Sequence, residues 1–479
     1  MTVDFKNLTI AEARVGLIAK KWSALDLYRA SRALIEEQKD LGAFLELFSD
    51  AEDLAKQADA RIAKGETGEL LGIPVAIKDN LLYKGHHASS ASKILDGYTA
   101  TYDGTVVKRL REAGAVIMGR TNMDEFAMGS SNENSGFGIV KNPHDTSRVP
   151  GGSSGGSAVA VAMYGVLASL GSDTGGSIRQ PASLCGVVGF KPSYGRVSRY
   201  GLMAMASSLD QIGPFGKTVA DVRTMYEVIS GHDTMDATSV PTALLPQVEA
   251  KKSYRIGIPT TFVHRKGIDA DVLKRFDETV EALKKAGHTI VDVDLPVLDH
   301  ALAVYYILMP AEVSSNLARF DGIRYGLSYQ EGSLRDVYDV SRAEGFGPEV
   351  RRRILLGTYV LSSGYYDAYY DKANLVRQKI SRDLGTVFQS VDLILTPTAP
   401  TPAFKIGEKT SDPLTMYLED IFTVPANIAG VPAISVPMGT VIRDEKNLPV
   451  GVQLMAPMYH DEWCLSGAEA IEQILEKGV

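Results

Sequence analysis

Three segments of the chain carry residue types that could perform nucleophilic chemistry. The segment IPVAIKDN at 73–80 places a lysine behind an apolar run, PGGSSGGSA at 150–158 holds two adjacent serines, and LGSDTGGSIRQPA at 170–182 places a serine after two glycines. A serine hydroxyl becomes a nucleophile at neutral pH only when a neighbouring base takes its proton. Together the three segments offer the nucleophile and the base that acyl transfer requires.

Lys78 is the candidate base. It follows three apolar residues of a predicted strand at 73–77, and burial at a strand end disfavours the ammonium and lowers the pKa of the amine. A lysine that merely extends from the strand end toward solvent is the simpler interpretation of this segment by itself. Lys78 alone therefore assigns no function.

The serines at 150–158 have more than one interpretation. Residues 151–155 match the G-x-S-x-G nucleophile elbow, in which Ser153 would be the nucleophile. An elbow needs an apolar strand directly before it, whereas residues 141–150 are polar and contain two prolines. The sequence thus argues against an elbow and leaves open a flexible loop or an anion-binding turn before a helix that begins near Ser157.

Ser177 lies in the third segment. Consecutive backbone N–H groups of Thr174, Gly175, Gly176 and Ser177, freed by the glycines, could converge beside the Ser177 hydroxyl as an oxyanion hole. The alternative is a glycine turn with an incidental serine. One buried helix is expected between Ser153 and Ser177, and this arrangement favours the catalytic interpretation.

Short apolar runs with β-branched residues alternate with helical patterns around these segments. The expected strands lie at 73–77, 115–118, 254–258, 289–293, 392–395 and 433–437, and the expected helices at 105–112 and 270–285. Strand and helix in alternation predict an α/β fold.

Three further stretches carry structural expectations. Residues 8–64 show apolar positions at three- and four-residue steps, which predict a helical N-terminal layer with a helix start at Ser23 and Asp26. The apolar run Ala158–Leu170 predicts a buried helix that is too short to cross a membrane. The proline-rich stretch at 396–402 predicts an exposed loop.

The run from Pro150 to Ala182, preceded by a lysine on a strand, resembles the signature of the amidase signature family. The resemblance implies that Ser177 attacks an amide carbonyl, that Ser153, in a cis peptide linkage, relays the proton, and that neutral Lys78 is the final base. Such a chain of groups activates a hydroxyl without histidine. Supporting roles in the loop and the turn are expected for Ser154, Asp173 and Arg179.

The same resemblance implies the fold. We expect one large α/β/α unit over residues 1–479 with a mixed central sheet and helices on both faces. Residues 1–65 would form the helical N-terminal layer, and residues 66–479 the α/β core that contains the signature segment at 150–182.

Segments at 311–326, 349–370 and 417–437 resemble a narrower group of the family, the glutaminase subunits of heterotrimeric aminoacyl-tRNA amidotransferases. The resemblance implies hydrolysis of glutamine and delivery of ammonia to two partner subunits. It places the α-carboxylate of glutamine on Arg353, its α-ammonium on Asp420, and Tyr305 or Tyr306 in the pocket wall. Without it, Arg351 to Arg353 could equally be a solvated helix face and Asp420 a helix N-cap.

Composition limits the partners of this chain. It has 50 Lys and Arg residues against 58 Asp and Glu, a formal net charge of −8, which gives no overall basic field for nucleic acid. No G-x-x-x-x-G-K-[ST] run occurs. We therefore expect charged tRNA to bind mainly through a partner subunit that also holds ATP and Mg²⁺, with no cofactor in this chain.

Metal and disulfide chemistry are not expected. The only cysteines are Cys185 and Cys464, too few for a disulfide scaffold or a multi-cysteine metal site, and a reducing cytoplasm is the simplest location. His86 and His87 are adjacent, so their side chains point apart on a strand, and no Cys/His cluster accompanies them. No membrane segment is apparent.

Two other functions stay open on sequence alone. A free-standing amidase acting on a small or acyl amide would use the same Lys78, Ser153 and Ser177. A non-catalytic scaffold could keep the fold without the activity. The sequence also leaves open whether the acceptor is Glu-tRNA(Gln), Asp-tRNA(Asn) or both.

Overall fold

A single mixed β-sheet crosses the chain in the computed structural model, which describes residues 3–476. The 11 strands run in the order β1 (Phe44–Leu47), β3 (Val116–Thr121), β2 (Pro74–Lys78), β4 (Ala168–Asp173), β6 (Gln211–Gly216), β5 (Val188–Lys191), β10 (Ala433–Arg443), β11 (Lys446–Met455), β9 (Leu393–Pro397), β7 (Arg255–Ile258) and β8 (Thr289–Asp292). The six expected strands are all present, and β1, β4, β5, β6, β11 and the second half of β10 were not anticipated.

Helices flank this sheet, which confirms the predicted α/β class. They are α1 (Ile10–Ile18), α2 (Ala24–Glu37), α3 (Ala51–Ala63), α4 (Thr105–Glu112), α5 (Gly155–Ala162), α6 (Arg179–Cys185), α7 (Val219–Ile229), α8 (Thr260–Val263), α9 (Ala270–Lys285), α10 (Ala301–Asn316), α11 (Leu334–Gly345), α12 (Pro348–Val360), α13 (Lys372–Val387), α14 (Pro413–Tyr417), α15 (Val424–Ala429) and α16 (Asp461–Glu476). The expected helices at 105–112 and 270–285 are α4 and α9.

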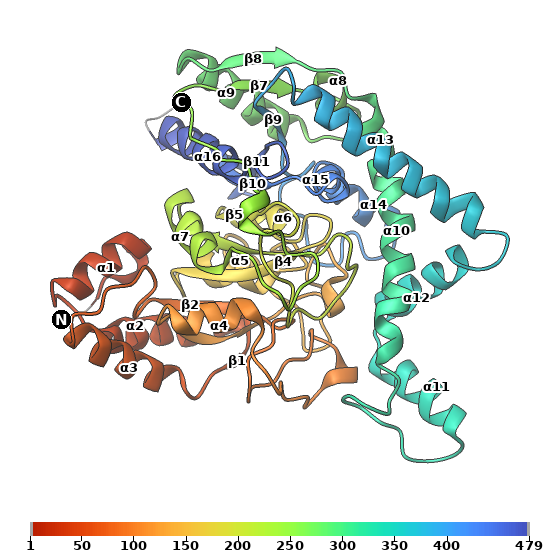
Figure 1. Cartoon of the computed structure of the whole chain (residues 1–479), viewed down its shortest axis with the longest axis horizontal. Coiled ribbons are helices and arrows are strands. Elements are labelled where there is room, and N and C mark those ends of the chain that lie inside the picture. Colours follow the sequence, from red (N-terminus) through yellow and green to blue (C-terminus); the bar gives the residue numbers. More distant parts are fainter. Residues whose placement is uncertain (1–2, 477–479) are drawn as a thin grey trace.

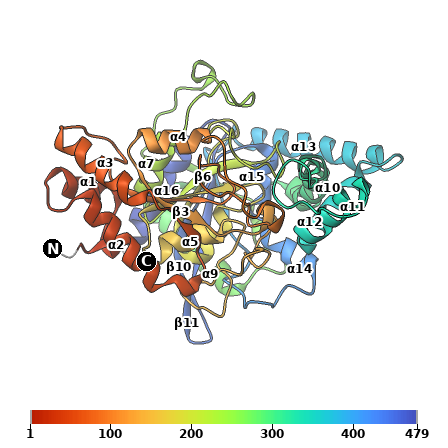
Figure 2. The ribbon, with the colours of Figure 1, turned by 90° about the horizontal axis from the view of Figure 1, so that it is seen from below.

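The two ends of the molecule are helical. Helices α1 to α3 lie at one end, and α10 to α13 form a lobe at the other (Figures 1 and 2). The strands and the helices α5 and α6 lie between them (Figure 1). No helix within residues 3–476 is long and apolar enough to cross a bilayer.

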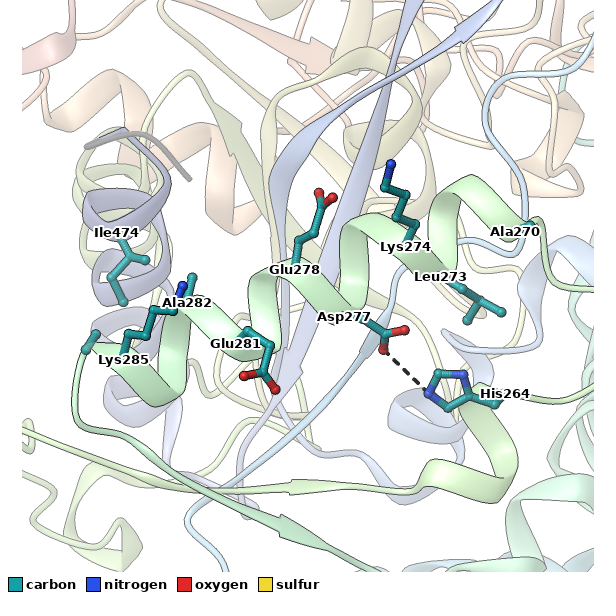
Figure 3. Close-up of a pocket in the computed structure, with 11 residues that line it drawn as sticks. His264, Ala270, Leu273, Lys274, Asp277, Glu278, Glu281, Ala282, Lys285 and Ile474 are labelled. Atoms are coloured by element: carbon teal, nitrogen blue, oxygen red, sulfur yellow. Dashed lines mark ion pairs between the residues drawn. The ribbon is translucent and has the colours of Figure 1, made fainter.

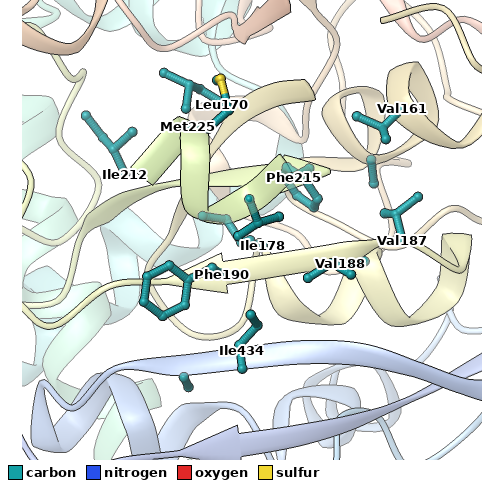
Figure 4. Close-up of a cluster of buried hydrophobic side chains, with 14 of the residues drawn as sticks. Val161, Leu170, Ile178, Val187, Val188, Phe190, Ile212, Phe215, Met225 and Ile434 are labelled. Atoms are coloured by element: carbon teal, nitrogen blue, oxygen red, sulfur yellow. The ribbon is translucent and has the colours of Figure 1, made fainter. Parts of the chain in front are cut away.

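The core lies where α5, α6 and α7 pack on the middle strands. Figure 4 shows apolar side chains from these elements meeting around β5 and β6. They include Val161 of α5, Leu170 of β4, Phe190 of β5, Phe215 of β6, Met225 of α7 and Ile434 of β10, all at most 1% exposed. Burial of aromatic and branched side chains from several strands fixes the order of the strands that carry the signature segment.

The N-terminal layer is largely as predicted. The expected start at Ser23 is a capping box, in which the Ser23 hydroxyl accepts the Asp26 N–H while the Asp26 carboxylate accepts the Ser23 N–H. The layer is not wholly helical, however, because β1 lies between α2 and α3 and pairs antiparallel with β3. A four-residue edge strand is too short to stand out against a helical pattern.

The single buried helix expected over Ala158–Leu170 is wrong. Helix α5 ends at Ala162, Tyr164 takes a positive φ of 61°, and β4 begins at Ala168. The backbone turns there, so the end of the apolar run becomes part of a central strand that lies between β2 and β6. An apolar run of this kind fits a buried helix and a buried strand equally well.

The exposed loop expected at 396–402 is also wrong. Its first residues end β9, and the Thr398 N–H donates to the carbonyl of Gly451 at 2.9 Å. Ala399 is buried with Leu184 and Ala403 in a small apolar cluster. Proline here removes donors at the end of a strand, and the stretch is covered by its neighbours instead of facing solvent.

Candidate active site

The three chemistry-bearing segments meet at one edge of the sheet. Strand β2 runs parallel to its neighbour β4, with Ile77 opposite Leu170. Lys78 is the last residue of β2, and β4 ends at Asp173, four residues before Ser177. The loop that carries Ser153 precedes α5, which packs on both strands. Carboxyl ends of parallel strands lie at the same edge of a sheet, so the fold brings the predicted base to the predicted nucleophile.

Lys78 is completely buried among hydroxyl groups. Its Nζ lies 2.8 Å from the Oγ atoms of Ser153 and Ser154 and 3.0 Å from Ser172 Oγ. Burial lowers the pKa of this amine to about 7, although the carboxylates of Asp124, Asp173 and Asp210 oppose the shift. A substantial neutral fraction therefore exists near pH 7, as a general base requires. The alternative of a lysine extending into solvent is wrong.

Ser153 and Ser177 differ in accessibility. The peptide bond Gly152–Ser153 is cis, and Ser153 has no exposed surface, whereas Ser177 keeps 9% of its surface exposed. No strand precedes Ser153 in residues 141–150, so it does not lie on an elbow. Ser153 contacts the base directly, and Ser177 is the more exposed of the two serines.

The turn before Ser177 offers free backbone donors. Within the described chain, the N–H groups of Thr174, Gly175, Gly176 and Ser177 donate to no protein acceptor. The Thr174 hydroxyl donates to Asp210 Oδ1 at 2.7 Å, and a Cβ on Gly175 would lie 2.6 Å from the Tyr305 ring. A tightly held turn with unpaired N–H groups is suited to stabilise a developing oxyanion.

Asp173 and Arg179 form a fully buried ion pair behind the turn. Arg179 donates from Nε to Asp173 Oδ2 at 3.0 Å and from Nη2 to Oδ1 at 2.9 Å. Burial alone would raise the pKa of Asp173, but the guanidinium holds it at about 2. Arg179 also donates to the Thr423 carbonyl at 2.8 Å and to Asn427 Oδ1 at 2.6 Å. The pair links the turn to residues 423–427.

Replacing Arg179 by methionine is expected to lower the free energy of unfolding by about 3–5 kcal/mol, because the Asp173 carboxylate would stay buried without its partner. Urea or thermal unfolding measures this loss. The matched control is Arg335→Met, since Arg335 pairs with Asp339 at the surface, 88% and 67% exposed, and exposed pairs contribute little. Equal stability of the two variants would contradict the structural role of Arg179.

Arg353 does not lie on a solvated helix face. It is 2% exposed, while the adjacent Arg351 and Arg352 are exposed. Its Nε donates to Glu349 Oε1 at 2.8 Å and its Nη2 to the Gly129 carbonyl at 3.1 Å. Nη1 contacts only Met309 Sδ, at 3.7 Å. One edge of the guanidinium therefore remains available for a carboxylate.

Asp420 is buried near Arg353 and is not a helix N-cap. Its carboxylate accepts from Ser130 Oγ at 2.8 and 2.9 Å and from the Tyr306 hydroxyl at 3.1 Å. Burial raises the pKa of Asp420 to about 7, and these hydrogen bonds and Arg353 only partly offset the effect. A cation that binds here would stabilise the carboxylate form.

Tyr305 and Tyr306 lie in different parts of the candidate pocket. Tyr305 packs on Gly175 in the oxyanion turn, whereas the Tyr306 ring stacks on Tyr417 at 3.9 Å between centroids. A cavity of about 160 Å³, lined in part by Gly129, Glu349 and Tyr417, adjoins this cluster. The structure thus connects the predicted glutamine subsite to the turn of Ser177.

A larger hollow, of about 930 Å³, lies over α9 (Figure 3). Its lining includes three acidic and two basic side chains of α9, and His264 pairs with Asp277 at 3.6 Å. No predicted site residue lines it, and it contains no hydroxyl or thiol nucleophile. The hollow is therefore separate from the cluster around Lys78 and Ser177.

The two adjacent histidines contact separate carboxylates. His86 Nε2 lies 3.3 Å from Asp50 and His87 Nδ1 lies 3.3 Å from Glu46. Among residues 3–476, no group of three His, Cys, Asp or Glu side chains is placed to hold a metal ion.

The family model described as Amidase matches residues 26–465. The chain belongs to the amidase family. The A subunit of glutamyl-tRNA(Gln) amidotransferase from Geobacillus thermodenitrificans is 52% identical over 473 residues, 97% of this chain and 96% of the relative. The A subunit of the amidotransferase from Desulfatibacillum aliphaticivorans, which has the same name, is 51% identical over 462 residues, 95% of each chain.

Solved structures of the amidase family have the same fold. The A subunit of glutamyl-tRNA(Gln) amidotransferase from Thermotoga maritima matches with a TM-score of 0.78 and 43% identity, over 98% of this chain and 95% of that one. A peptide amidase from Stenotrophomonas maltophilia matches with a TM-score of 0.80 and 27% identity, over 98% and 97%. Both the family resemblance and the narrower resemblance to the amidotransferase subunits are confirmed.

Several residues of the site were not found from the sequence. Ser130 binds Asp420, Ser172 binds Lys78, and the Thr423 hydroxyl donates to the Gly175 carbonyl at 2.6 Å. Ser172 lies inside the signature segment, where its place beside Asp173 was a usable signal. Ser130 and Thr423 are single polar residues with no local pattern, and only the fold brings them to the site.

Proposed function

We propose that this chain is the glutaminase subunit of a glutamyl-tRNA(Gln) amidotransferase. The observation that carries the proposal is the buried Lys78, whose pKa is lowered to about 7, in contact with Ser153 and close to the loop of Ser177, which is 9% exposed. Full-length similarity to proteins of that name supports the substrate and the partners. The chain would hydrolyse glutamine to glutamate and ammonia.

The proposed reaction begins with proton transfer. Neutral Lys78 accepts the proton of Ser153, which accepts that of Ser177, and Ser177 Oγ attacks the side-chain carbonyl carbon of glutamine. In the described structure no hydrogen bond joins the Ser153 and Ser177 hydroxyls. Catalytic hydrogen bonds often close only when substrate binds, and binding of the amide would complete this contact.

The tetrahedral intermediate then collapses. Its oxyanion is held by the N–H groups of residues 174–177. The carbon–nitrogen bond breaks, and the proton held on Lys78 returns through Ser153 to the leaving nitrogen, which departs as ammonia. Water attacks the resulting Ser177 ester and passes a proton through Ser153 to Lys78. The bond between the acyl carbon and Ser177 Oγ then breaks, the proton returns through Ser153 to Ser177, and glutamate leaves. Arg353 would bind the α-carboxylate and Asp420 the α-ammonium throughout.

Binding of glutamine by Arg353 is testable. Arg353→Lys is expected to raise KM for glutamine by about 10- to 100-fold with a smaller effect on kcat, because lysine cannot bind a carboxylate bidentately. Steady-state kinetics with a coupled glutamate assay measures the change. Arg351→Lys is the control on the exposed face of α12 and should leave KM unchanged. An unaltered KM in Arg353→Lys would remove this residue from the pocket.

We further propose two partner subunits, one of which holds charged tRNA, ATP and Mg²⁺. The net charge of −8 supports a division in which another chain carries the nucleic-acid surface. Co-purification with untagged partners, followed by glutaminase assays with and without charged tRNA, tests this. Activity should be weak for the isolated chain and should rise with partners and tRNA.

A free-standing amidase is the second candidate, and the fold shared with a peptide amidase favours testing it. It predicts efficient turnover of simple amides by the isolated chain and no effect of partners or tRNA. That result would refute the proposed role within a complex. Assays with Glu-tRNA(Gln) and Asp-tRNA(Asn) side by side would identify the acceptor.

A further inference from the structure

Three hydroxyl oxygens surround the amine of Lys78, and two of them, those of Ser154 and Ser172, belong to residues that the proposed mechanism does not use. Ser153 and Ser154 lie 2.8 Å from Nζ, and Ser172 Oγ lies 3.0 Å away. Ser172 is on β4 and is 2% exposed. Its neighbours are therefore protein groups, and the direction of each hydrogen bond can be traced.

The ammonium form of Lys78 is fully satisfied by this shell. An ammonium has three N–H donors, and the three serine oxygens provide one acceptor each. The Ser172 carbonyl oxygen, at 3.5 Å, is at the limit of hydrogen bonding. Removing any one hydroxyl would leave a buried N–H of the charged form without a strong acceptor.

The neutral form needs a donor for its lone pair, and Ser154 cannot provide it. The Ser154 hydroxyl donates to the Ser172 carbonyl at 3.1 Å and accepts the Ser172 N–H at 3.3 Å. The proton of the Ser154 hydroxyl is therefore already used in the bond to the Ser172 carbonyl. Toward Lys78 this hydroxyl can only accept a hydrogen bond. The lone pair of the neutral amine must face either Ser153, as catalysis requires, or Ser172.

Asn80 holds Ser172 in this position. Its Nδ2 donates to Ser172 Oγ at 3.0 Å, and Asn80 is 1% exposed. It follows Lys78 by two residues, beyond the end of β2, beside the end of parallel β4. With Asn80 Nδ2 facing Ser172, no residue of the described chain other than Lys78 receives the proton of the Ser172 hydroxyl, and Asn80 Oδ1 is itself buried without a partner. Ser172 can therefore donate to the lone pair in place of Ser153.

We propose that Ser172, held by Asn80, is a positioning residue that acts through Lys78. It stabilises the ammonium as the third acceptor, and it competes with Ser153 for the lone pair of the neutral amine. Ser172 thus sets the pH at which the relay becomes active. This inference rests on the proposed role of Lys78 as the base.

Other charged groups near Lys78 remain constant in the test. Asp124 in the segment after β3, Asp173 at the end of β4 and Asp210 before β6 are the carboxylates that act on the amine. None is hydrogen-bonded to Ser172 Oγ or to the Asn80 side chain. A shift of the pH profile in a Ser172 or Asn80 variant therefore reports on the Ser172 hydroxyl and on its hydrogen bond with Asn80.

The experiment is the pH profile of kcat/KM for glutamine, measured on the full chain co-purified with its partners. Ser172→Ala is expected to move the acidic limb about one pH unit lower, because both forms lose a partner but the hydrogen bond from the charged ammonium is the stronger one, so the charged form loses more. Ser172→Thr keeps the hydroxyl and should keep the wild-type limb. Asn80→Asp adds a negative charge beside Ser172 and should move the limb to higher pH.

The outcomes separate positioning from a merely structural role. A uniform loss of activity in Ser172→Ala with an unmoved acidic limb overturns the proposal, as does a limb in Asn80→Asp that fails to rise. If Ser172→Ala does not fold, Ser172→Cys, which keeps the volume with a weaker acceptor, must move the limb downward. Activity that survives Lys78→Ala would instead refute the proposed function, so the two failures are distinguishable.

Discussion

Replacing Ser177 by alanine is expected to lower kcat for glutamine hydrolysis by at least ~10³-fold, as removal of a nucleophile that acts as a unit with its base does. The reason is local, since Ser177 is more accessible than Lys78 and Ser153 and lies beside the free N–H groups of its own turn. The assay is release of glutamate and ammonia by the purified protein, with folding checked by circular dichroism.

The matched control is Ser183→Ala. Ser183 is a buried serine of α6, 2% exposed, whose hydroxyl has no protein hydrogen-bond partner in the described chain. This variant should retain activity. Unchanged hydrolysis in Ser177→Ala would favour a scaffold without catalysis. Mass spectrometry of an inhibitor adduct locates the nucleophile independently. An adduct on Ser153 would mean that Ser153, not Ser177, is the nucleophile, as the elbow interpretation requires.

Replacing Lys78 is expected to cost about as much activity as replacing Ser177. Alanine removes the base, and arginine, which stays protonated, cannot accept the Ser153 proton at any pH. The double variant Lys78→Ala with Ser177→Ala should be no worse than either alone, because the groups share one proton relay. Additive losses in that double variant would count against the relay.

The pH dependence of activity shows whether the neutral or the charged form of Lys78 is the active one. Burial lowers the pKa of this amine to about 7, and the neutral form is the active one. Activity should therefore be full well above pH 7 and fall as the pH drops below it, by about tenfold per unit. Measurement of kcat/KM for glutamine over a range of pH on both sides of this pKa tests the sign. An acidic limb that persists in an active Lys78 variant would assign the titration to another group.

Several features of this protein were determined by local sequence. The capping box at Ser23 specifies a helix start through contacts three residues apart, and α4 and α9 follow from the spacing of their apolar residues. The glycines of the signature segment at 150–182 indicate a turn that only small residues can form. The structure agrees, because a Cβ at Gly175 or Gly176 would collide with Tyr305 or Thr423.

The tertiary structure decided between conformations that the sequence patterns allow equally. The apolar run Ala158–Leu170 became a helix and the start of a strand because β4 inserts between β2 and β6. The stretch at 396–402 begins inside β9, which pairs with β11, so it is covered instead of exposed. Pairings between distant strands have no local signal.

The chemistry of the site depends on the same long-range contacts. The apolar residues before Lys78 favour its burial but do not by themselves make it a base. Its base character comes from burial among the hydroxyls of Ser153, Ser154 and Ser172, which lie far away in the sequence. The sequence determined which residues could do chemistry. Only the fold, by excluding water and directing hydrogen bonds, decided the protonation and the partners of the base.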